Sequence, residues 1–477
     1  MNDTAPNPRN PKEAARPAPA APDNRSLRWG VYLLLIFVSA GAMFGRILAV
    51  DSVDKAARSH RPFLSANDRS RWCTVRALVE PDMRVADAPY AIDLVIQQPN
   101  WDTIDMVKHR GHLYSSKPPL FSTLMAGVYW PIYRFTGVTL ATHPYEIGRS
   151  MLVLFNLLPL VIYFLLLAAL IDRLGTTDWG RLFVMAAAAF GTFLTTFAVT
   201  INNHLPAAVC ALAAVYAVVR IWFDGQRRSR YFIIAGLFGA LAAANEFPAL
   251  ALLAAIALVL LWKAPKPTLL WFTPAVLVVA GAFFGTNWIA LRSLAPADVH
   301  RADAGDWYDY TYERNGRQIE SYWKNPVGVD RGEPRQGVYA LNLLVGHHGI
   351  FSLTPLWLLS IVGLFFWMIR RGDPRVRWMA AAIFAISTAC TAFYVFQPVM
   401  NRNYGGMTSG PRWLFWLAPL WLLAMLPMVD FLARWRWTRG LALLLLALSV
   451  VSVASPTWNP WTQPWLTVLW QYVGHGA

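Results

Sequence analysis

Apolar stretches of membrane-spanning length recur along this chain and constrain its fold more than any other feature. A helix needs about 20 apolar residues to cross a bilayer. Runs near that length occur at 29–50, 148–171, 181–201, 205–222, 269–291, 350–369, 378–396, 413–433 and 440–456. With 56% hydrophobic and 14% charged residues, the composition is unsuited to a soluble globule. The sequence therefore predicts an all-α integral membrane protein.

The basic loops predict how the apolar runs are threaded. The stretch 231–262 is too long for one crossing, and basic residues both precede it, between 220 and 230, and follow it, at Lys263 and Lys266. Because basic loops favour the cytoplasmic side, 231–262 is expected to be a helical hairpin that reverses near 245–248. The same argument makes 118–138 an interfacial or re-entrant helix. The prediction is a bundle of about 11 spans, with the N-terminus inside and the C-terminus outside.

This threading divides the chain into segments. Most polar features then fall on the extracytoplasmic side, while the cytoplasmic loops are short and basic. The predicted segments are a disordered cytoplasmic tail (1–28), a first transmembrane helix (29–50), an extracytoplasmic catalytic loop with an interfacial helix (51–147), a transmembrane bundle (148–291), an extracytoplasmic loop (292–349), a C-terminal bundle (350–456) and a Trp-rich interfacial tail (457–477).

Charge and cysteine content exclude several classes of function. The net charge is +15, but the Arg residues lie in short loops between apolar runs, as in membrane proteins, which argues against nucleic-acid binding. The three cysteines are widely spaced, and two lie in apolar runs, so no disulfide framework or zinc site is predicted.

The first polar segment carries two motifs that suit an anionic substrate. Asp68 and Arg71 are three residues apart and share a face of a predicted helix; a surface ion pair or a helix cap is the simpler interpretation. Lys117-Pro118-Pro119 places a lysine at the start of the apolar interfacial helix, where the helix dipole and the ammonium both favour an anion. Tyr114 could hydrogen-bond the same anion, whereas a snorkelling lysine is the alternative.

Further candidates lie at the ends of later spans. Asn203 and His204 stand between two apolar runs, where a capping role is the commoner one, and Glu246 lies in the predicted hairpin. An acid so close to the membrane is a functional candidate unless it is a solvated turn residue. Arg412 follows a glycine-rich loop whose amides could grip a phosphate or carboxylate. The loop 292–349 interleaves aromatic residues and carboxylates, which suits a sugar or an interfacial aromatic belt.

Together, the acid that opens the first outside loop, the Arg three residues on and Lys-Pro-Pro-Leu before an interfacial helix resemble the GT-C glycosyltransferases. The resemblance is greatest to the protein O-mannosyltransferase and lipid A aminoarabinose transferase group, over roughly residues 29–260. It implies a polyprenyl-phosphate sugar donor, with Asp68 as the catalytic aspartate and Arg71 and Lys117 on the donor phosphate.

Two departures from the family pattern leave rival acids. Arg69 stands where a second acid is common, and the interval from Asp68 to Lys117 is long and contains Asp102 and Asp105. A lipid phosphate is a good leaving group, so one carboxylate can act as general base while fixed cations stabilise the departing phosphate. Direct displacement would invert the anomeric centre. No obligatory metal is predicted, although a divalent ion is not excluded.

Other functions compete with sugar transfer. A lipid or solute transporter commonly has internal repeats, which this sequence lacks. A non-catalytic polyprenyl-lipid-binding protein would not need Asp68, and a ligase acting on phosphate-linked lipids would depend on the 292–349 loop. No nucleic-acid partner is expected, and the sequence identifies neither the sugar, the acceptor nor any protein partner.

Overall fold

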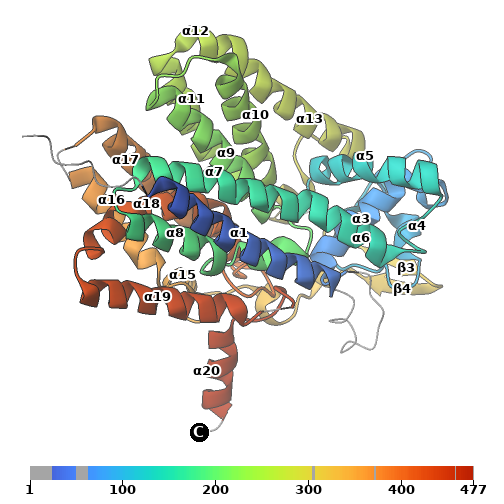
Figure 1. The fold of residues 1–477 in the computed structure, drawn as a ribbon. Helices are drawn as coiled ribbons and strands as arrows, with labels where there is room; N and C mark the ends of the chain where they lie inside the picture. The colour runs from blue at the N-terminus through green and yellow to red at the C-terminus, as the bar shows by residue number, and fades with distance from the viewer. Residues whose placement is uncertain (1–23, 50–62, 303–306, 370–371, 457, 476–477) are drawn as a thin grey trace, which may run out of the picture.

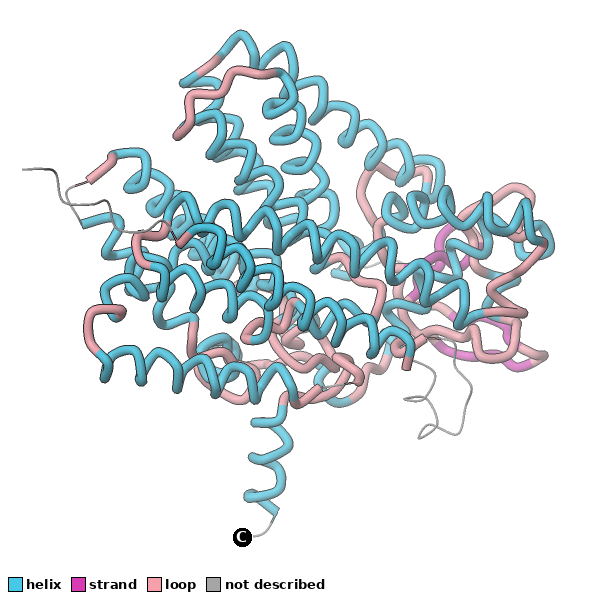
Figure 2. The backbone as a smooth tube through the Cα atoms, in the orientation of Figure 1, coloured by secondary structure: helices cyan, strands magenta, loops and turns pink. Residues whose placement is uncertain are grey.

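The computed structural model describes residues 24–49, 63–302, 307–369, 372–456 and 458–475, and these residues form an almost entirely helical bundle (Figure 1, Figure 2). Most of the predicted tail, 1–23, and the start of the predicted catalytic loop, through residue 62, lie outside the described residues. The all-α fold class is confirmed, and two short β-hairpins are added to it.

Eight described helical segments are long and apolar enough to cross a membrane, which makes the chain a multi-pass membrane protein. They contain α1 (Arg25–Leu48), α6 and α7 (Pro144–Leu152 and Leu158–Leu174), α8 (Asp178–Phe190), α9 (His204–Trp222), α12 and α13 (Pro265–Pro267 and Thr273–Leu291), α17 (Pro374–Val395), α18 (Ala418–Leu432) and α19 (Arg436–Ala454). Three further apolar helices are shorter: α10 (Ser229–Asn245), α11 (Leu250–Lys263) and α16 (Trp357–Ile369).

Small residues allow the central helices to pack closely. α9 packs against α7 and α10, and α18 packs against α8 and α16. A Cβ on Gly363 of α16 would lie 2.0 Å from the carbonyl oxygen of Ala424, and one on Gly236 would lie 2.4 Å from that of Phe272. Close approach at such small residues is how membrane helices gain packing without a hydrophobic driving force.

The predicted break in the 231–262 stretch is present. α10 ends at Asn245, a 3-10 turn covers Phe247–Ala249, and α11 begins at Leu250 and packs back against α10. The proline in this turn cannot donate a backbone hydrogen bond within a continuing helix, which accounts for the reversal. Glu246 therefore lies at the end of the α10–α11 hairpin, where the sequence predicted it.

The first polar segment gathers at one end of the bundle (Figure 1). It contains α3 (Ala66–Val79), α4 (Asp93–Ile96), β1 (Met106–His109), β2 (His112–Ser115) and α5 (Pro119–Thr136). α3 packs on α5, and this contact is fixed by a buried Glu80, which accepts hydrogen bonds from Arg76 at 2.7 and 2.9 Å and from the Tyr129 hydroxyl at 2.9 Å. These contacts hold the first polar segment, from α3 to α5, in one arrangement. We refer to this segment as the platform.

The second polar segment adds a hairpin to the same end. β3 (Thr311–Arg314) pairs with β4 (Arg317–Glu320) around Asn315-Gly316, both of which have positive φ. Asn-Gly is the favoured two-residue hairpin turn, so this hairpin had a local sequence signal. The remaining helices are α14 (Gln336–Leu344), α15 (Ile350–Leu353) and, after α19, α20 (Trp465–His475).

Candidate functional site

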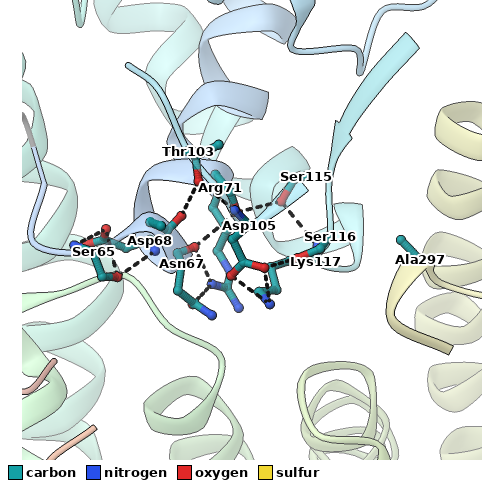
Figure 3. Close-up of polar contacts among 12 residues, drawn as sticks. Ser65, Asn67, Asp68, Arg71, Thr103, Asp105, Ser115, Ser116, Lys117 and Ala297 are labelled. Carbon is teal, nitrogen blue, oxygen red and sulfur yellow. Dashed lines mark hydrogen bonds and ion pairs between the residues drawn. The ribbon is translucent and has the colours of Figure 1, made fainter. Parts of the chain in front are cut away.

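Asp68 closes the N-terminal turn of α3 (Figure 3). It also bonds Thr200 of the helix bundle. One carboxylate oxygen accepts the Ser65 backbone N–H at 3.0 Å, while the Ser65 hydroxyl accepts the Asp68 N–H at 3.2 Å, forming a capping box. The other oxygen accepts the Thr200 hydroxyl at 2.6 Å. Burial raises the pKa of Asp68, against these hydrogen bonds and the charge of Arg69. The capping interpretation is therefore correct, but it does not use the whole carboxylate.

Arg71 lies one turn further along α3 and is almost completely buried. Its guanidinium donates to the Asn67 carbonyl at 3.1 Å and to the Asn203 side-chain oxygen at 2.8 Å. Burial lowers the pKa of Arg71 to about 10, and repulsion from Arg412 acts in the same direction. Asp68 and Arg71 thus both contact the short segment 200–203 between α8 and α9.

Lys117 pairs with Asp105 and makes no ion pair with Asp68 (Figure 3). Its ammonium lies 2.9 and 3.0 Å from the two Asp105 oxygens, and the Ser116 hydroxyl donates to the same carboxylate. Burial opposes ionisation of Asp105, but Lys117, Ser116 and Arg71 outweigh it and lower its pKa. Burial and the charge of Arg71 lower the pKa of Lys117 despite Asp105. As predicted, α5 begins just after this lysine, at Pro119, with Pro118 as its N-cap.

Asn203, Glu246, His204 and Arg412 form one hydrogen-bonded chain at the helix ends. The Asn203 amide donates to Glu246 at 2.7 Å, His204 Nδ1 contacts the same Glu246 oxygen, and Arg412 Nη1 lies 3.3 Å from His204 Nε2. Because Arg412 can only donate, His204 Nε2 is the acceptor and Nδ1 carries the proton that is donated to Glu246. His204 is therefore a neutral imidazole with one defined tautomer.

The two guanidinium groups of this site are bonded to neutral partners. Arg412 donates to the Gly405 carbonyl at 2.8 Å and stacks on the Trp461 ring, 4.7 Å from its centroid. Within the part of the chain that the structure describes, no carboxylate forms an ion pair with Arg71 or Arg412. Asp105 and Glu246 attract both guanidinium groups from a distance, but neither carboxylate forms an ion pair with them. The arrangement suits a bound anion.

A narrow apolar groove, about 20 Å³ in volume, leads to Arg71. It runs between the start of α5 and the end of α10, and Arg71 and Asn203 form its polar end. The other lining residues are Pro118, Leu120, Phe121, Leu124, Leu241, Ala244 and Asn245. A groove with apolar walls and a cationic end suits a molecule with a hydrocarbon chain and an anionic head.

A larger and more polar cavity opens beyond the Asp105 side of the site. It has a volume of about 690 Å³ and lies between the turn of the first hairpin and the start of the second. Its lining residues are Lys108, His109, Arg110, Gly111, Trp307, Asp309, Tyr310, Thr311 and Lys324. The cavity belongs to the same platform, because Lys108 N–H donates to the Trp307 carbonyl and the Tyr310 hydroxyl donates to that of Met106.

Two predicted site residues lie elsewhere. Tyr114 packs in a separate apolar cluster with Tyr90, Val107 and Leu291. Its neighbour Ser115 faces α3 instead, where its hydroxyl bonds that of Ser70 at 2.9 Å. The Asp102 carboxylate lies 3.6 Å from Arg314 of the second hairpin.

Three residues of the site carried no sequence signal. Thr200 bonds Asp68, and Trp461 donates to Thr200 from the segment after α19. Asp298 lies near enough to Lys117 and Asp105 for their charges to act on its pKa. Only the fold brings these positions together. Among the described residues, no group of three or more His, Cys, Asp or Glu side chains is arranged to hold a metal ion.

Comparison of the sequence with known protein families and with curated proteins found no match. Among solved structures, the fold is similar to apo ArnT from Cupriavidus metallidurans, with 14% identity, a TM-score of 0.48, and coverage of 90% of this chain and 64% of that chain. It is also similar to the Archaeoglobus fulgidus oligosaccharyltransferase AglB, both in the apo form (12% identity, TM-score 0.44, 90% and 56% covered) and in complex with an inhibitory peptide and a dolichol-phosphate (12%, 0.44, 91% and 56%).

This chain thus spans less than two thirds of the length of each of these proteins. Both are members of the GT-C superfamily, to which the sequence motifs also pointed. At these identities and scores the similarity by itself carries no conclusion about reaction or substrate.

Proposed function

We propose that this chain is a GT-C-type membrane glycosyltransferase that moves a sugar from a polyprenyl-phosphate donor to an acceptor hydroxyl. The observation that carries the proposal is the group of Arg71, Lys117 and Arg412. Arg71 stands at the end of an apolar groove, and among the described residues no carboxylate forms an ion pair with Arg71 or Arg412. We refer to these three residues as the cation group. A lipid-linked phosphate has the matching chemistry: a negative head and a hydrocarbon chain.

The donor phosphate would replace existing contacts in the cation group. Arg71 and Arg412 can each present N–H groups to phosphate oxygens, and Lys117 adds a point charge at the N-terminus of α5. In the free protein Lys117 is neutralised by Asp105. Phosphate binding would share this lysine between two anions. Fixed cations would then stabilise the charge that grows on the phosphate as the sugar leaves.

The hydrocarbon chain of the donor would lie in the groove between α5 and α10. Leu120, Phe121, Leu124 and Leu241 supply its apolar walls. Several neighbouring side chains are exposed on the outer surface of the bundle, as expected of a groove that opens to lipid. The donor could therefore enter from the membrane without leaving it.

Asp68 is the better general base of the two buried acids, and Asp105 the better support for Lys117. A base is most effective when its pKa is near the working pH. Burial raises the pKa of Asp68, whereas the cations around Asp105 lower its pKa. Asp68 also lines a small pocket with Tyr145 and Ile201. We assign proton removal from the acceptor to Asp68, with inversion at the anomeric carbon.

The acceptor would approach through the polar cavity of about 690 Å³. This cavity is lined by β1, which begins directly after Asp105, and it offers aromatic and charged groups to a polar molecule. The short loops at the opposite ends of the helices are basic, which favours placing this cavity on the extracytoplasmic face, with the N-terminus inside.

The test uses purified protein in lipid nanodiscs with radiolabelled polyprenyl-phosphate sugars. Wild type is expected to bind a donor and to transfer or hydrolyse its sugar. Asp68→Asn should bind but not react, and Lys117→Ala should bind poorly. If no form binds any polyprenyl donor, the transferase proposal is wrong, and lipid or solute transport becomes the function to test.

A further inference from the structure

The chain after α19 returns to the site instead of lying apart from it. The Ser409 N–H donates to the Pro460 carbonyl at 2.9 Å, so this segment is tied to the glycine-rich loop that precedes Arg412. Asn459 accepts the Trp461 N–H at 2.9 Å, which closes a local turn. Trp465 donates to Ser452 of α19 at 2.8 Å. Residues 458–465 are therefore anchored on both sides of Trp461.

Trp461 contacts both Thr200, the hydrogen-bond partner of Asp68, and Arg412 of the cation group. Its indole N–H donates to the Thr200 hydroxyl at 3.1 Å, and the Arg412 guanidinium lies over its ring at 4.7 Å. The edge of Phe197 packs against the same ring, with centroids 5.5 Å apart. One side chain thus joins the proposed base, through Thr200, to a member of the cation group.

The direction of these hydrogen bonds gives Trp461 a specific effect. An indole N–H can only donate, and a threonine hydroxyl has one proton to give. Because Thr200 accepts from Trp461, its own proton is left for Asp68, whose oxygen is 2.6 Å away. Trp461 therefore holds the Thr200 hydroxyl in the orientation that stabilises the ionised Asp68.

We propose that Trp461 is a positioning residue of the transferase site, acting on Asp68 through Thr200 and on the donor phosphate through Arg412. This inference rests on the proposed function. It replaces the prediction that the Trp-rich tail is only an interfacial anchor. Trp470 of the same tail is 75% exposed and suits that anchoring role, so the tail contains both kinds of tryptophan.

The variants separate the two contacts. Trp461→Phe keeps an aromatic face for Arg412 but removes the N–H, and Thr200→Val removes the hydroxyl directly. Both should lower kcat about tenfold, the value of one lost hydrogen bond, and leave the donor KM unchanged. Trp461→Leu removes both contacts and should also raise the donor KM about tenfold. Trp470→Leu is the matched control and should change neither constant.

Two results would contradict a positioning role for Trp461. If Trp461→Leu and Trp470→Leu have the same kcat and KM as wild type, Trp461 has no positioning role. If Trp461→Phe and Trp461→Leu lower only the amount of folded protein, with unchanged constants, the residue is structural.

A cross-link tests the placement without using activity. Ser409→Cys with Pro460→Cys should form a disulfide on oxidation, because their backbones are hydrogen-bonded, and the three native cysteines are buried. Absence of the cross-link would overturn the placement of the segment. If the cross-link forms but wild type transfers no polyprenyl-linked sugar, the placement holds, and the role falls with the proposed function.

Discussion

The two ends of the helix bundle use the same charged residue types in opposite ways. His204 and Arg220 mark these ends on α9, about 24 Å apart at 1.5 Å per residue. At the Arg220 end, charges are matched: Arg28 lies 2.6 Å from Asp172 and 2.5 Å from Asp178, and Arg220 lies 2.7 Å from Asp224. At the His204 end, Arg71 and Arg412 contact neutral groups and repel each other.

We infer from this difference that the paired charges at the Arg220 end stabilise the fold, whereas Arg71 and Arg412 are available to bind a ligand. Asp430, at the matched end, accepts four hydrogen bonds from the backbone and side chains of Thr176 and Thr177, at 2.6 to 3.0 Å. Nothing further can bind there without breaking these bonds. Arg71 and Arg412 of the cation group lack such completion, whereas Lys117 is paired with Asp105. An anion would supply it, so substitutions should affect stability at one end and activity at the other.

The largest expected effect is on the proposed base. Asp68→Asn should lower kcat by about 10²- to 10⁴-fold, the usual contribution of a general base, while the donor still binds. Asp430→Asn is the control at the matched end. It should lower the free energy of unfolding by about 1–3 kcal/mol through the lost hydrogen bonds, with kcat of the folded protein unchanged. Turnover in nanodiscs and thermal unfolding measure the two effects, and an active Asp68→Asn would refute the assignment of the base.

Removing the lysine charge should weaken donor binding. Lys117→Ala is expected to raise the donor Kd about 10- to 100-fold, as for loss of one charged hydrogen bond. Asp105→Asn keeps the lysine but removes its acidic partner, and it should raise the donor Kd much less than Lys117→Ala does. Binding of radiolabelled donor distinguishes these results, and equal Kd values for wild type and Lys117→Ala would contradict the proposal.

The pH dependence should follow the same lysine. Lys117 binds phosphate when protonated, and its pKa is lowered below 10.5 by burial and by Arg71. Donor affinity should therefore fall as the pH rises through this lowered pKa. Lys117→Arg should move the fall to higher pH, because a guanidinium keeps its proton to a higher pH than an ammonium does. An unchanged pH profile in Lys117→Arg would mean that ionisation of Lys117 does not control donor affinity.

Through Lys117, rising pH should affect folding stability in the opposite direction to donor affinity. Between the folded pKa and 10.5, the unfolded chain binds more protons at this lysine than the folded chain does. Its contribution to the free energy of unfolding should therefore increase with pH in that window. Denaturation of Lys117→Met should remove this increase, which separates the lysine from other alkaline transitions.

The smallest effect is expected from substituting one glycine at each end of the bundle, Gly405 and Gly225. Gly405 has φ +95°, and a Cβ there would lie 3.0 Å from Arg412 Nε. Gly405→Ala should therefore raise the donor KM a few-fold as well as costing about 1–2 kcal/mol of backbone strain. Gly225 has φ +65° with no atom within 4 Å of its Cβ position, so Gly225→Ala should show the strain alone. Equal donor KM values in both variants would mean that Gly405 does not position Arg412.

Local sequence signals predicted the parts of the site that neighbouring residues determine. Two prolines after Lys117 predicted the start of α5, and Pro248 with flanking basic loops predicted the α10–α11 reversal. The pairing of Lys117 with Asp105 depends on how the first hairpin folds back, which no local pattern specifies. Side chains alternate along a strand, so with Ser115 facing α3, Tyr114 points away from the site.

Donor affinity in nanodiscs, compared between Arg412→Gln and Arg28→Gln, tests the central claim most directly. Both variants remove one guanidinium charge, one from each end of the bundle. Arg412→Gln is expected to raise the donor Kd about 10-fold or more with little loss of stability, while Arg28→Gln should lower the unfolding temperature and leave the Kd unchanged. Equal Kd values, or a Kd effect confined to Arg28→Gln, would contradict it.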